Sequence, residues 1–401
     1  MMGVDTITLG CRLNFAESEA MRGLAEDGTI IVNSCAVTNE AVRQTRQAIR
    51  RAHRERPDVR IVVTGCAAQL DPASFAAMPE VARVVGNAEK YDRRAFAIGG
   101  QSKIHVSDVM AAPVPPVAAG FLSRVRSFVA VQTGCDHRCT FCSIWQARGP
   151  SRSLPYEAVR DAIALELDAG AKEIVLTGVD ITAYEGSLGL LCQRLLDALP
   201  SLQRLRLSSL DSIEVDEALF ELVTGEPRLL PHFHLSLQAG DDLILKRMKR
   251  RHSRAQAVAL VERLKGLRGD VSIGADLIAG FPTESEQAAL GSLALLDDCD
   301  VVAAHIFPFS PRPDTPAARM PQLEREIVKA RAARLREAAA ARRMRWLGNQ
   351  VGTRQMVLVE NKEKGHSDLF APVYIVGSRR GDVGSARITG RDGDQLVGTF
   401  E

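Results

Sequence analysis

The chain lacks several features that would each define a class of protein. No apolar run approaches the roughly 20 residues of a membrane-spanning helix. The first residues, MMGVDTITLG, have neither the basic nor the apolar stretch of a signal peptide. The net charge is only +2, so binding to nucleic acid would require local basic patches. We therefore expect a cytoplasmic protein with reduced thiols and no membrane partner.

The residues that are present are typical of a folded chain with more than one domain. Hydrophobic residues make up 46% and charged residues 25% of the 401 residues. Residues 1–110 alternate between short apolar runs and helical patterns, which predicts an open parallel α/β domain. Its expected strands are Thr6–Leu9, Thr29–Val32, Arg60–Thr64 and Ala82–Val85. The proline-rich residues 111–120 predict a linker.

Residues 121–347 predict a second domain, built from six strand–helix repeats. The expected strands are Ser127–Gln132, Glu173–Thr177, Arg204–Ser208, His232–Leu237, Val271–Asp276 and Val301–Phe307. Six parallel units predict a partial (βα)6 barrel that is open on one side. Short alternating strands with glycine turns then predict a small β-barrel over residues 348–401. The predicted fold class is therefore α/β with a C-terminal β-barrel.

Three cysteines lie together in Cys135-Asp136-His137-Arg138-Cys139-Thr140-Phe141-Cys142. Three thiolates at this spacing can each bind one iron of a 4Fe–4S cluster, which leaves the fourth iron open. A structural zinc site would need a fourth ligand, for which only His137 is near in sequence. A disulfide is disfavoured in a reducing compartment. The spacing therefore favours a cluster.

Three more cysteines each follow an expected strand of the first domain. Cys11, Cys35 and Cys66 lie just beyond the carboxyl ends of the first three strands, where ligands of open α/β sheets bind. They can converge there, although buried cysteines often serve only as small apolar side chains. Cys192 and Cys299 lie in leucine-rich helical patterns, and we expect both to be structural.

The motif around Cys135, Cys139 and Cys142 resembles that of the radical S-adenosylmethionine (SAM) superfamily. The resemblance implies that the open iron binds the amino and carboxylate groups of SAM. It also implies reductive cleavage of SAM to a 5′-deoxyadenosyl radical. The residues expected to contact SAM follow the barrel strands and are Phe141, Gly178, Asp180, Ser209, Gln238, Ile278, Gly280 and Phe309.

Individual signals for SAM binding are weak. Asp180 is a plausible acceptor for the SAM ammonium, but an aspartate at this place can also cap a helix. The segment Gly280-Phe281-Pro282-Thr283-Glu284 is similar to the superfamily's Gly-Phe-Pro-Gly-Glu, with Thr283 in place of a glycine. This difference leaves the geometry of that turn open.

The segments Leu9-Gly10-Cys11-Arg12-Leu13-Asn14, Asn33-Ser34-Cys35-Ala36-Val37-Thr38 and Thr64-Gly65-Cys66 resemble the methylthiotransferase family. The resemblance covers nearly the whole chain. It implies that Cys11, Cys35 and Cys66 hold a second, auxiliary 4Fe–4S cluster concerned with sulfur transfer. The small C-terminal β-barrel resembles the TRAM domain, which binds RNA in tRNA-modifying enzymes.

Two basic stripes occur at helical spacing. Lys329–Arg345 has seven basic residues and one acidic residue, and we expect its arginines to be exposed opposite an apolar face. The second stripe consists of Arg43, Arg46, Arg50 and Arg54. Solvated helix faces explain most such runs, whereas stripes near a barrel mouth would suit RNA phosphates.

Within the family, the motifs look most like the branch that acts on N6-threonylcarbamoyladenosine in tRNA. The resemblance implies that C2 of this adenine, next to the anticodon, receives a methylthio group from two SAM molecules and a sulfur source. Candidates for recognising the polar threonylcarbamoyl group are Arg312, Ser310 and His232 or His234, although a hydrogen-bonded core histidine is the commoner case. The expected partners are the tRNA anticodon stem-loop and an external electron donor, and we expect a monomer.

Three alternatives stay open from the sequence. The isopentenyladenosine branch uses the same chemistry on tRNA. The branch that modifies a ribosomal-protein aspartate usually has Pro-Lys after the first cysteine, whereas Arg12-Leu13 stands here. A noncatalytic cluster-bearing RNA-binding protein is disfavoured by the second cysteine triad.

Overall fold

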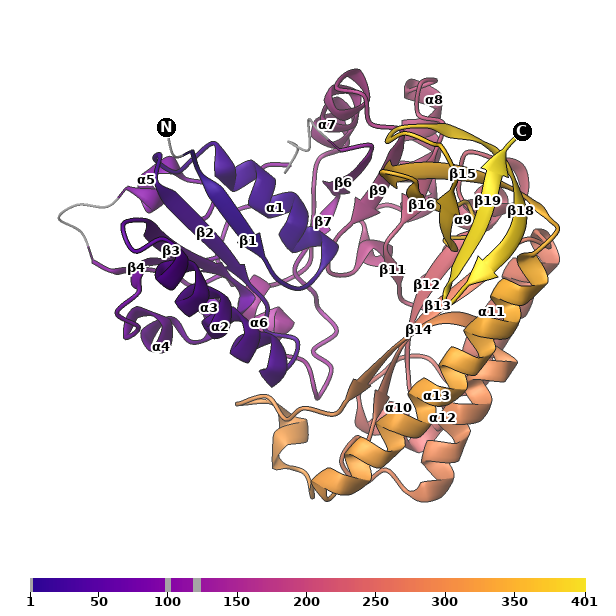
Figure 1. Ribbon diagram of the computed structural model, residues 1–401. Coiled ribbons are helices and arrows are strands. Elements are labelled where there is room, and N and C mark those ends of the chain that lie inside the picture. Colours follow the sequence, from indigo (N-terminus) through magenta and orange to yellow (C-terminus); the bar gives the residue numbers. More distant parts are fainter. Residues whose placement is uncertain (1–2, 98–101, 118–123) are drawn as a thin grey trace.

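The computed structural model describes residues 3–97, 102–117 and 124–401. Figure 1 shows an α/β region at the N-terminus, a central region of strands covered by helices, and a small β-barrel at the C-terminus. The predicted α/β fold class with a C-terminal barrel is therefore confirmed. The domain boundaries stay predictions, and residues 118–123 of the expected linker and central domain lie outside the described residues. No described helix is both long and apolar enough to cross a bilayer.

The N-terminal sheet has five parallel strands in the order β1-β2-β3-β4-β5. They are β1 (Asp5–Thr8), β2 (Thr29–Ser34), β3 (Arg60–Gly65), β4 (Val81–Val85) and β5 (Ile104–His105). Every residue of β2 is buried, as expected for a parallel strand with both faces covered. The covering helices are α1 (Arg12–Arg22), α2 (Asn39–Glu55), α3 (Cys66–Leu70), α4 (Pro72–Ala76) and α5 (Arg93–Phe96). The sequence did not predict β5, because two residues are too short to show a pattern.

The central wall consists of two sheets that together form the partial barrel. The first contains β6 (Arg126–Ala130), β9 (Glu173–Thr177) and β10 (Leu205–Leu207). The second contains β11 (Ser209–Leu210), β12 (His232–Gln238), β13 (Ser272–Ala279) and β14 (Val301–Pro308). The third expected strand, Arg204–Ser208, corresponds to β10, and β11 begins directly after it in the second sheet, so the wall splits into two sheets at Ser208.

Helices cover the outside of this wall. They are α7 (Tyr156–Asp168), α8 (Leu188–Ala198), α9 (Glu217–Gly225), α10 (Asp242–Arg247), α11 (Arg254–Leu267) and α12 (Glu286–Asp298). Phe233, Leu235 and Leu237 of β12 pack in the core beneath them. Because side chains alternate along a strand, His232 and His234 face the opposite side, which is the barrel interior.

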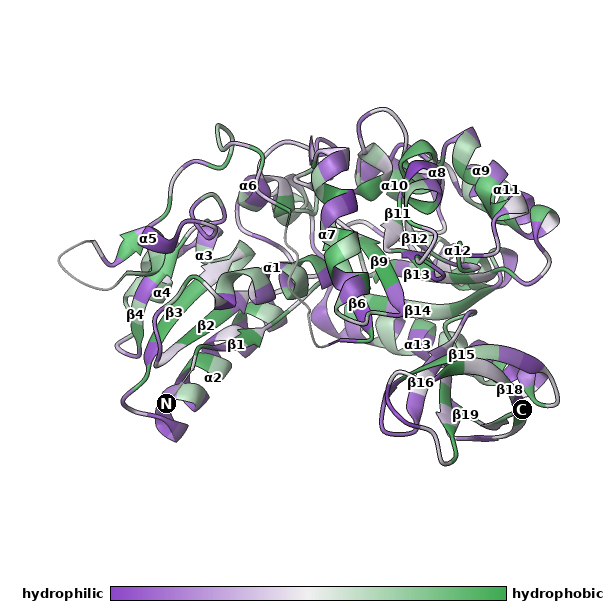
Figure 2. Ribbon diagram, turned by 90° about the horizontal axis from the view of Figure 1, so that it is seen from above, coloured by the Kyte–Doolittle hydropathy of each residue, from purple (hydrophilic) through white to green (hydrophobic). Residues whose placement is uncertain are grey.

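The long helix α13 (Arg325–Gln350) packs against β14 and α12 and leads into the C-terminal barrel. This barrel closes in the order β15-β16-β17-β19-β18. The strands are β15 (Arg354–Asn361), β16 (Lys364–Ser367), β17 (Pro372–Ile375), β18 (Val383–Asp392) and β19 (Gln395–Phe400). Figure 2 shows this barrel beside the central domain, on the opposite side from the N-terminal sheet. The polar residues of β16 gave no apolar alternation, and the sequence therefore missed that strand.

The N-terminal domain contacts both edges of the open barrel. Helix α1 packs against the edge strand β6. At the other edge, the backbone N–H of Asn39 donates to Oγ of Ser310 at 3.2 Å, and its side-chain amide donates to the carbonyl of Pro311 at 3.2 Å. These two contacts place the carboxyl ends of β1, β2 and β3 next to the barrel opening.

A turn of the C-terminal barrel inserts Phe370 into the amino-terminal end of the central barrel. The Phe370 ring stacks on His232 with ring centres 5.0 Å apart and on His366 at 4.6 Å. Three guanidinium groups lie over the same ring, from Arg206 at 4.8 Å, Arg126 at 5.3 Å and Arg12 at 5.6 Å. The turn thus joins all three regions of the chain, since Arg12 comes from the N-terminal domain.

We expect Phe370→Ala to destabilise the protein by about 2–4 kcal/mol, because the ring fills space and attracts three cations. Urea unfolding followed by circular dichroism measures the loss. Phe370→Leu is the matched control, since it keeps apolar volume but removes the aromatic face, and should cost less. Equal stability of all three proteins would contradict the role given to this ring.

Candidate active site

The Cys135, Cys139 and Cys142 triad lies in a tightly wrapped loop between β7 (Gln132–Thr133) and α6 (Ile144–Arg148). Gly134 has φ +75°, and a Cβ there would lie 1.8 Å from the carbonyl oxygen of Pro150. Only glycine therefore fits at the start of the loop. The backbone N–H of Ile144 donates to Sγ of Cys142 at 3.4 Å.

The buried side chain of Arg250, in the segment that follows α10, contacts this triad. Nη1 of Arg250 donates to Sγ of Cys139 at 3.6 Å, and its Nη2 donates to Asp211 at 2.7 Å. Burial raises the pKa of both Cys135 and Cys142 to about 12. A metal cluster would displace these protons, and the arginine suits the negative charge that thiolate ligands bring.

Cys11, Cys35 and Cys66 follow β1, β2 and β3 at one edge of the N-terminal sheet. Burial, together with negative charge on Cys66 and Cys11, raises the pKa of Cys35 to about 12. The structure therefore brings the three thiols near one another. Gly10, with φ +94°, allows this approach, because a Cβ there would lie 2.7 Å from Sγ of Cys35.

Arg148 connects the chain segment of the first triad to the second triad. It lies at the end of α6, six residues after Cys142, yet its Nε donates to Sγ of Cys66 at 3.2 Å. Its two terminal nitrogens donate to both carboxylate oxygens of Glu17 at 2.7 and 2.9 Å. One of them also donates to Oδ1 of Asn14 at 2.7 Å. The sequence did not reveal this residue, because Cys66 and Glu17 lie 82 and 131 residues away.

The charges around Glu17 fit an anionic group at the second triad. Both Arg148 and Lys90 are buried, and both pair with Glu17, with Nζ of Lys90 at 2.6 Å. Burial alone would raise the pKa of Glu17, but these two cations lower it to about 2. Two cations thus face one carboxylate, which leaves one positive charge without a carboxylate partner. This charge can stabilise the negative charge of three thiolates and a cluster. Each triad therefore has the donors that an iron–sulfur cluster needs.

A group of carboxylates lies beside Cys135. One carboxylate oxygen of Asp180 is 4.0 Å from Sγ of Cys135 and 2.7 Å from Nε2 of His137. Hydrogen bonds to Asp180 and Glu214 raise the pKa of His137 to about 10, so that its ring carries a positive charge at neutral pH. Asp180 precedes the 3-10 helix η1 (Ile181–Ala183), but its side chain does not cap it. Asp180 is therefore placed to accept from a cation, as an ammonium acceptor must be.

The remaining residues expected to contact SAM fall into two groups. Phe141, Ile278 and Phe309 pack in one apolar cluster around the buried Phe281. The second group consists of polar residues and glycines at strand ends. Gly178 follows β9, Ser209 begins β11, Gln238 ends β12 and Gly280 follows β13. Both groups surround the carboxyl ends of the barrel strands, as in other barrels.

The turn with the unusual threonine keeps a glycine-like backbone. Thr283 has φ +68°, a region that a side chain with a branched Cβ rarely adopts. Its Oγ1 accepts a hydrogen bond from Nη1 of Arg247 at 2.8 Å, and its carbonyl lies 3.4 Å from the same atom. The contact with Arg247 helps to hold the threonine in this conformation.

The two histidines of β12 have different surroundings. His232 is buried against Phe370, and burial lowers its pKa well below the ordinary value. Nε2 of His234 lies 2.9 Å from Oδ1 of Asp276, and Nδ1 of His305 lies 3.0 Å from the same oxygen. The side chain of His305 is 64% exposed. The sequence missed Asp276 and His305, which come from β13 and β14.

The arginines of α13 form only part of the exposed stripe that the sequence predicted, since Arg336 and Arg345 are exposed but others are covered. The Arg331 side chain is only 11% exposed and pairs with Glu284 at 2.9 Å. Arg342 is 16% exposed and pairs with Asp297 and Asp300. The expectation was wrong for these two arginines because α13 lies on β14 and α12, and acidic residues distant in sequence pair with them.

Comparisons with known proteins agree with this arrangement. The Radical SAM superfamily matches residues 129–296, and the family described as Uncharacterized protein family UPF0004 matches residues 4–86. A threonylcarbamoyladenosine tRNA methylthiotransferase MtaB from Rickettsia prowazekii is 42% identical over 92% of this chain and 91% of its own length. The MtaB of Thermotoga maritima is 34% identical over 97% and 94%.

A second kind of relative matches less closely. A tRNA-2-methylthio-N(6)-dimethylallyladenosine synthase from Ehrlichia chaffeensis is 30% identical over 92% of this chain and 90% of its own length. Among solved structures, the radical SAM methyltransferase TsrM from Kitasatospora setae has a TM-score of 0.53 at 16% identity, covering 75% of this chain and 68% of TsrM. At this identity the structural match supports the fold alone.

Proposed function

The chain belongs to the radical SAM methylthiotransferase family, and on that premise we propose that it adds a methylthio group to C2 of N6-threonylcarbamoyladenosine in tRNA. The observation that carries the proposal is the pair of thiol triads, with Arg148, six residues after Cys142, bonded to Cys66 and Glu17. Noncatalytic RNA binding alone would not require this buried link. We further propose a cytoplasmic location, which a tRNA substrate supports, with an external electron donor and a sulfur source as further partners.

In this proposal the two triads have different roles. Cys135, Cys139 and Cys142 would hold the cluster that binds SAM, and Cys11, Cys35 and Cys66 the auxiliary cluster. When bound, the first cluster supplies the electron that cleaves SAM, and the second supplies the site of sulfur transfer. Asp180 accepts a cation beside Cys135, and the Phe141, Ile278 and Phe309 cluster gives an apolar surface to a planar base.

The polar cluster on β12, β13 and β14 supports the threonylcarbamoyl substrate. The carboxylate of this group needs donors, whereas an isopentenyl group needs none. Of the four candidate residues, Ser310 accepts from Asn39 and His232 is buried against Phe370. His234 faces the interior with Asp276 and the exposed His305.

We expect purified enzyme to prefer tRNA with threonylcarbamoyladenosine over tRNA with isopentenyladenosine by several orders of magnitude. A site built with buried polar groups strongly rejects an analogue that leaves them unpaired. The two tRNAs are supplied in competition, and mass spectrometry of the nucleosides measures both products. His305→Leu removes one polar group of this site and should reduce the preference for threonylcarbamoyladenosine over isopentenyladenosine. A stronger reaction with the isopentenyl substrate would overturn the proposal in favour of the function named for the Ehrlichia relative.

A further inference from the structure

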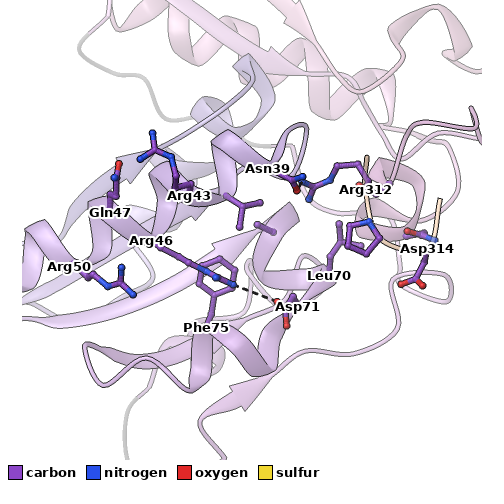
Figure 3. Close-up of a pocket in the computed structure, with 15 residues that line it drawn as sticks. Asn39, Arg43, Arg46, Gln47, Arg50, Leu70, Asp71, Phe75, Arg312 and Asp314 are labelled. Atoms are coloured by element: carbon purple, nitrogen blue, oxygen red, sulfur yellow. Dashed lines mark hydrogen bonds and ion pairs between the residues drawn. The ribbon is translucent and has the colours of Figure 1, made fainter. Parts of the chain in front are cut away.

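A groove of about 760 Å³ lies between α2 and the segment that follows β14. Figure 3 shows its side chains, with Arg43, Gln47 and Arg50 along α2 and Arg312 at the far end. Four arginines line it but only two carboxylates, from Asp71 and Asp314. The residues that line the groove therefore carry a net positive charge, which suits an anionic ligand.

Three donors in the groove have no partner within the described part of the chain. They are Nε of Arg312, Oγ of Ser143 and Nε of Arg46. Arg312 is 7% exposed and Ser143 is 4% exposed, so neither is hydrated from bulk solvent. Unsatisfied buried polar groups are costly, and a ligand that accepts hydrogen bonds would satisfy all three.

Arg312 has an unusual environment for a buried cation. Nη1 of Arg312 donates to the neutral amide oxygen of Asn39 at 2.5 Å. Among the described residues, no carboxylate lies within ion-pair distance of it. A buried charge without a counterion is strongly unfavourable. Apart from Cys35, whose negative charge acts on Arg312, a counterion must therefore come from a bound ligand.

The position of the groove indicates which anion fits. Ser143 directly follows Cys142, and Arg312 is held by Asn39, four residues after Cys35. The inner end thus lies beside both triads. From there Arg46, Gln47 and Arg50 extend outward along α2, and three to four residues of helix advance about 4.5–6 Å. A series of separated negative charges would follow this row, which is the pattern of a nucleic-acid backbone.

We propose that this groove binds the phosphodiester backbone of the RNA strand that carries the reacting base. The inference rests on the proposed function and adds the surface that recognises the substrate. Arg312 and Ser143 contact the phosphate nearest the triads, and Arg46, Arg50 and Arg43 contact the phosphates further out. Arg43 exchanges its exposed contact with Glu40 for the RNA.

The test compares two double variants with the wild-type holoenzyme. Arg43→Gln with Arg50→Gln removes two charges from the groove. Arg22→Gln with Arg51→Gln removes two charges from exposed arginines outside it, one of them on the same helix. An anticodon stem-loop RNA is titrated at several salt concentrations. Each lost phosphate contact lowers the slope of log K against log salt by roughly 0.7–0.9.

The groove variant should bind RNA about ten- to a hundredfold more weakly and lose roughly 1.5 from the salt slope, with the control unchanged. RNA with uncharged methylphosphonate links beside the target adenosine should weaken wild-type binding but weaken the groove variant little further. Equal RNA affinity and equal salt slope for the groove and control variants would overturn the proposal. An acidic protein would then be the better candidate for the groove. Nucleoside analysis of the wild type reports separately on the proposed reaction.

Discussion

Replacing Cys135, Cys139 and Cys142 with alanine should remove about half of the bound iron and all SAM cleavage, because the two triads hold separate clusters. Replacing Cys11, Cys35 and Cys66 should also halve the iron but leave SAM cleavage in place. Product formation should fall to background in both variants. Iron content and 5′-deoxyadenosine are measured after anaerobic reconstitution, and methylthiolated nucleoside is measured with tRNA.

Cys192→Ala with Cys299→Ala is the matched control, since both residues are fully buried in the hydrophobic core. This variant should keep full iron and full activity. Full iron and full product formation without Cys11, Cys35 and Cys66 would show that the auxiliary cluster has been assigned to the wrong residues.

Arg148→Met should cost about 3–5 kcal/mol of stability, the usual effect of breaking a buried ion pair. It should also abolish methylthiolation, because Cys66 loses its donor and Glu17 keeps only Lys90. SAM cleavage should largely persist, since no contact of Cys135 or Cys139 changes. Arg152→Met is the control, because Arg152 lies four residues further on and donates only to backbone carbonyls.

The effect of Arg148→Met on stability should depend on pH with a definite sign. The pKa of Glu17 is about 2 in the folded protein and about 4.5 ordinarily. The stabilisation from its ionised form is therefore present above pH 4.5 and is lost as the pH falls toward 2. Urea unfolding of the cluster-free proteins at several pH values should show wild type and variant converging over this window. A constant difference down to pH 2 would contradict the pairing.

Much of this architecture could be predicted from local pattern. Apolar runs, turn residues and helical periodicity located most strands, and the rule that parallel strands share one edge placed Cys11, Cys35 and Cys66 at the end of the N-terminal sheet. Short polar strands such as β16 carry no such signal. The split of the wall into two sheets at Ser208 was also invisible in the pattern.

Contacts between distant segments could not be predicted in the same way. Nothing in the local sequence distinguished Arg148 from other arginines. Its role depends on its contacts with Glu17 and Cys66. The two basic stripes looked alike in sequence. Only the folded chain shows that Arg331 and Arg342 are neutralised by acidic neighbours, whereas Arg50 has no such neighbour among the described residues.

The Phe370 turn has a consequence for the order in which the chain acquires its structure. Phe370 is synthesised after the central barrel, yet it covers Arg206 and Arg126 of that barrel and Arg12 of the N-terminal region. Domains generally fold in the order of synthesis. The ring that covers these three arginines therefore arrives only after the elements that carry them. A chain that stops before Phe370 would lack this cover both in the N-terminal region and in the central barrel.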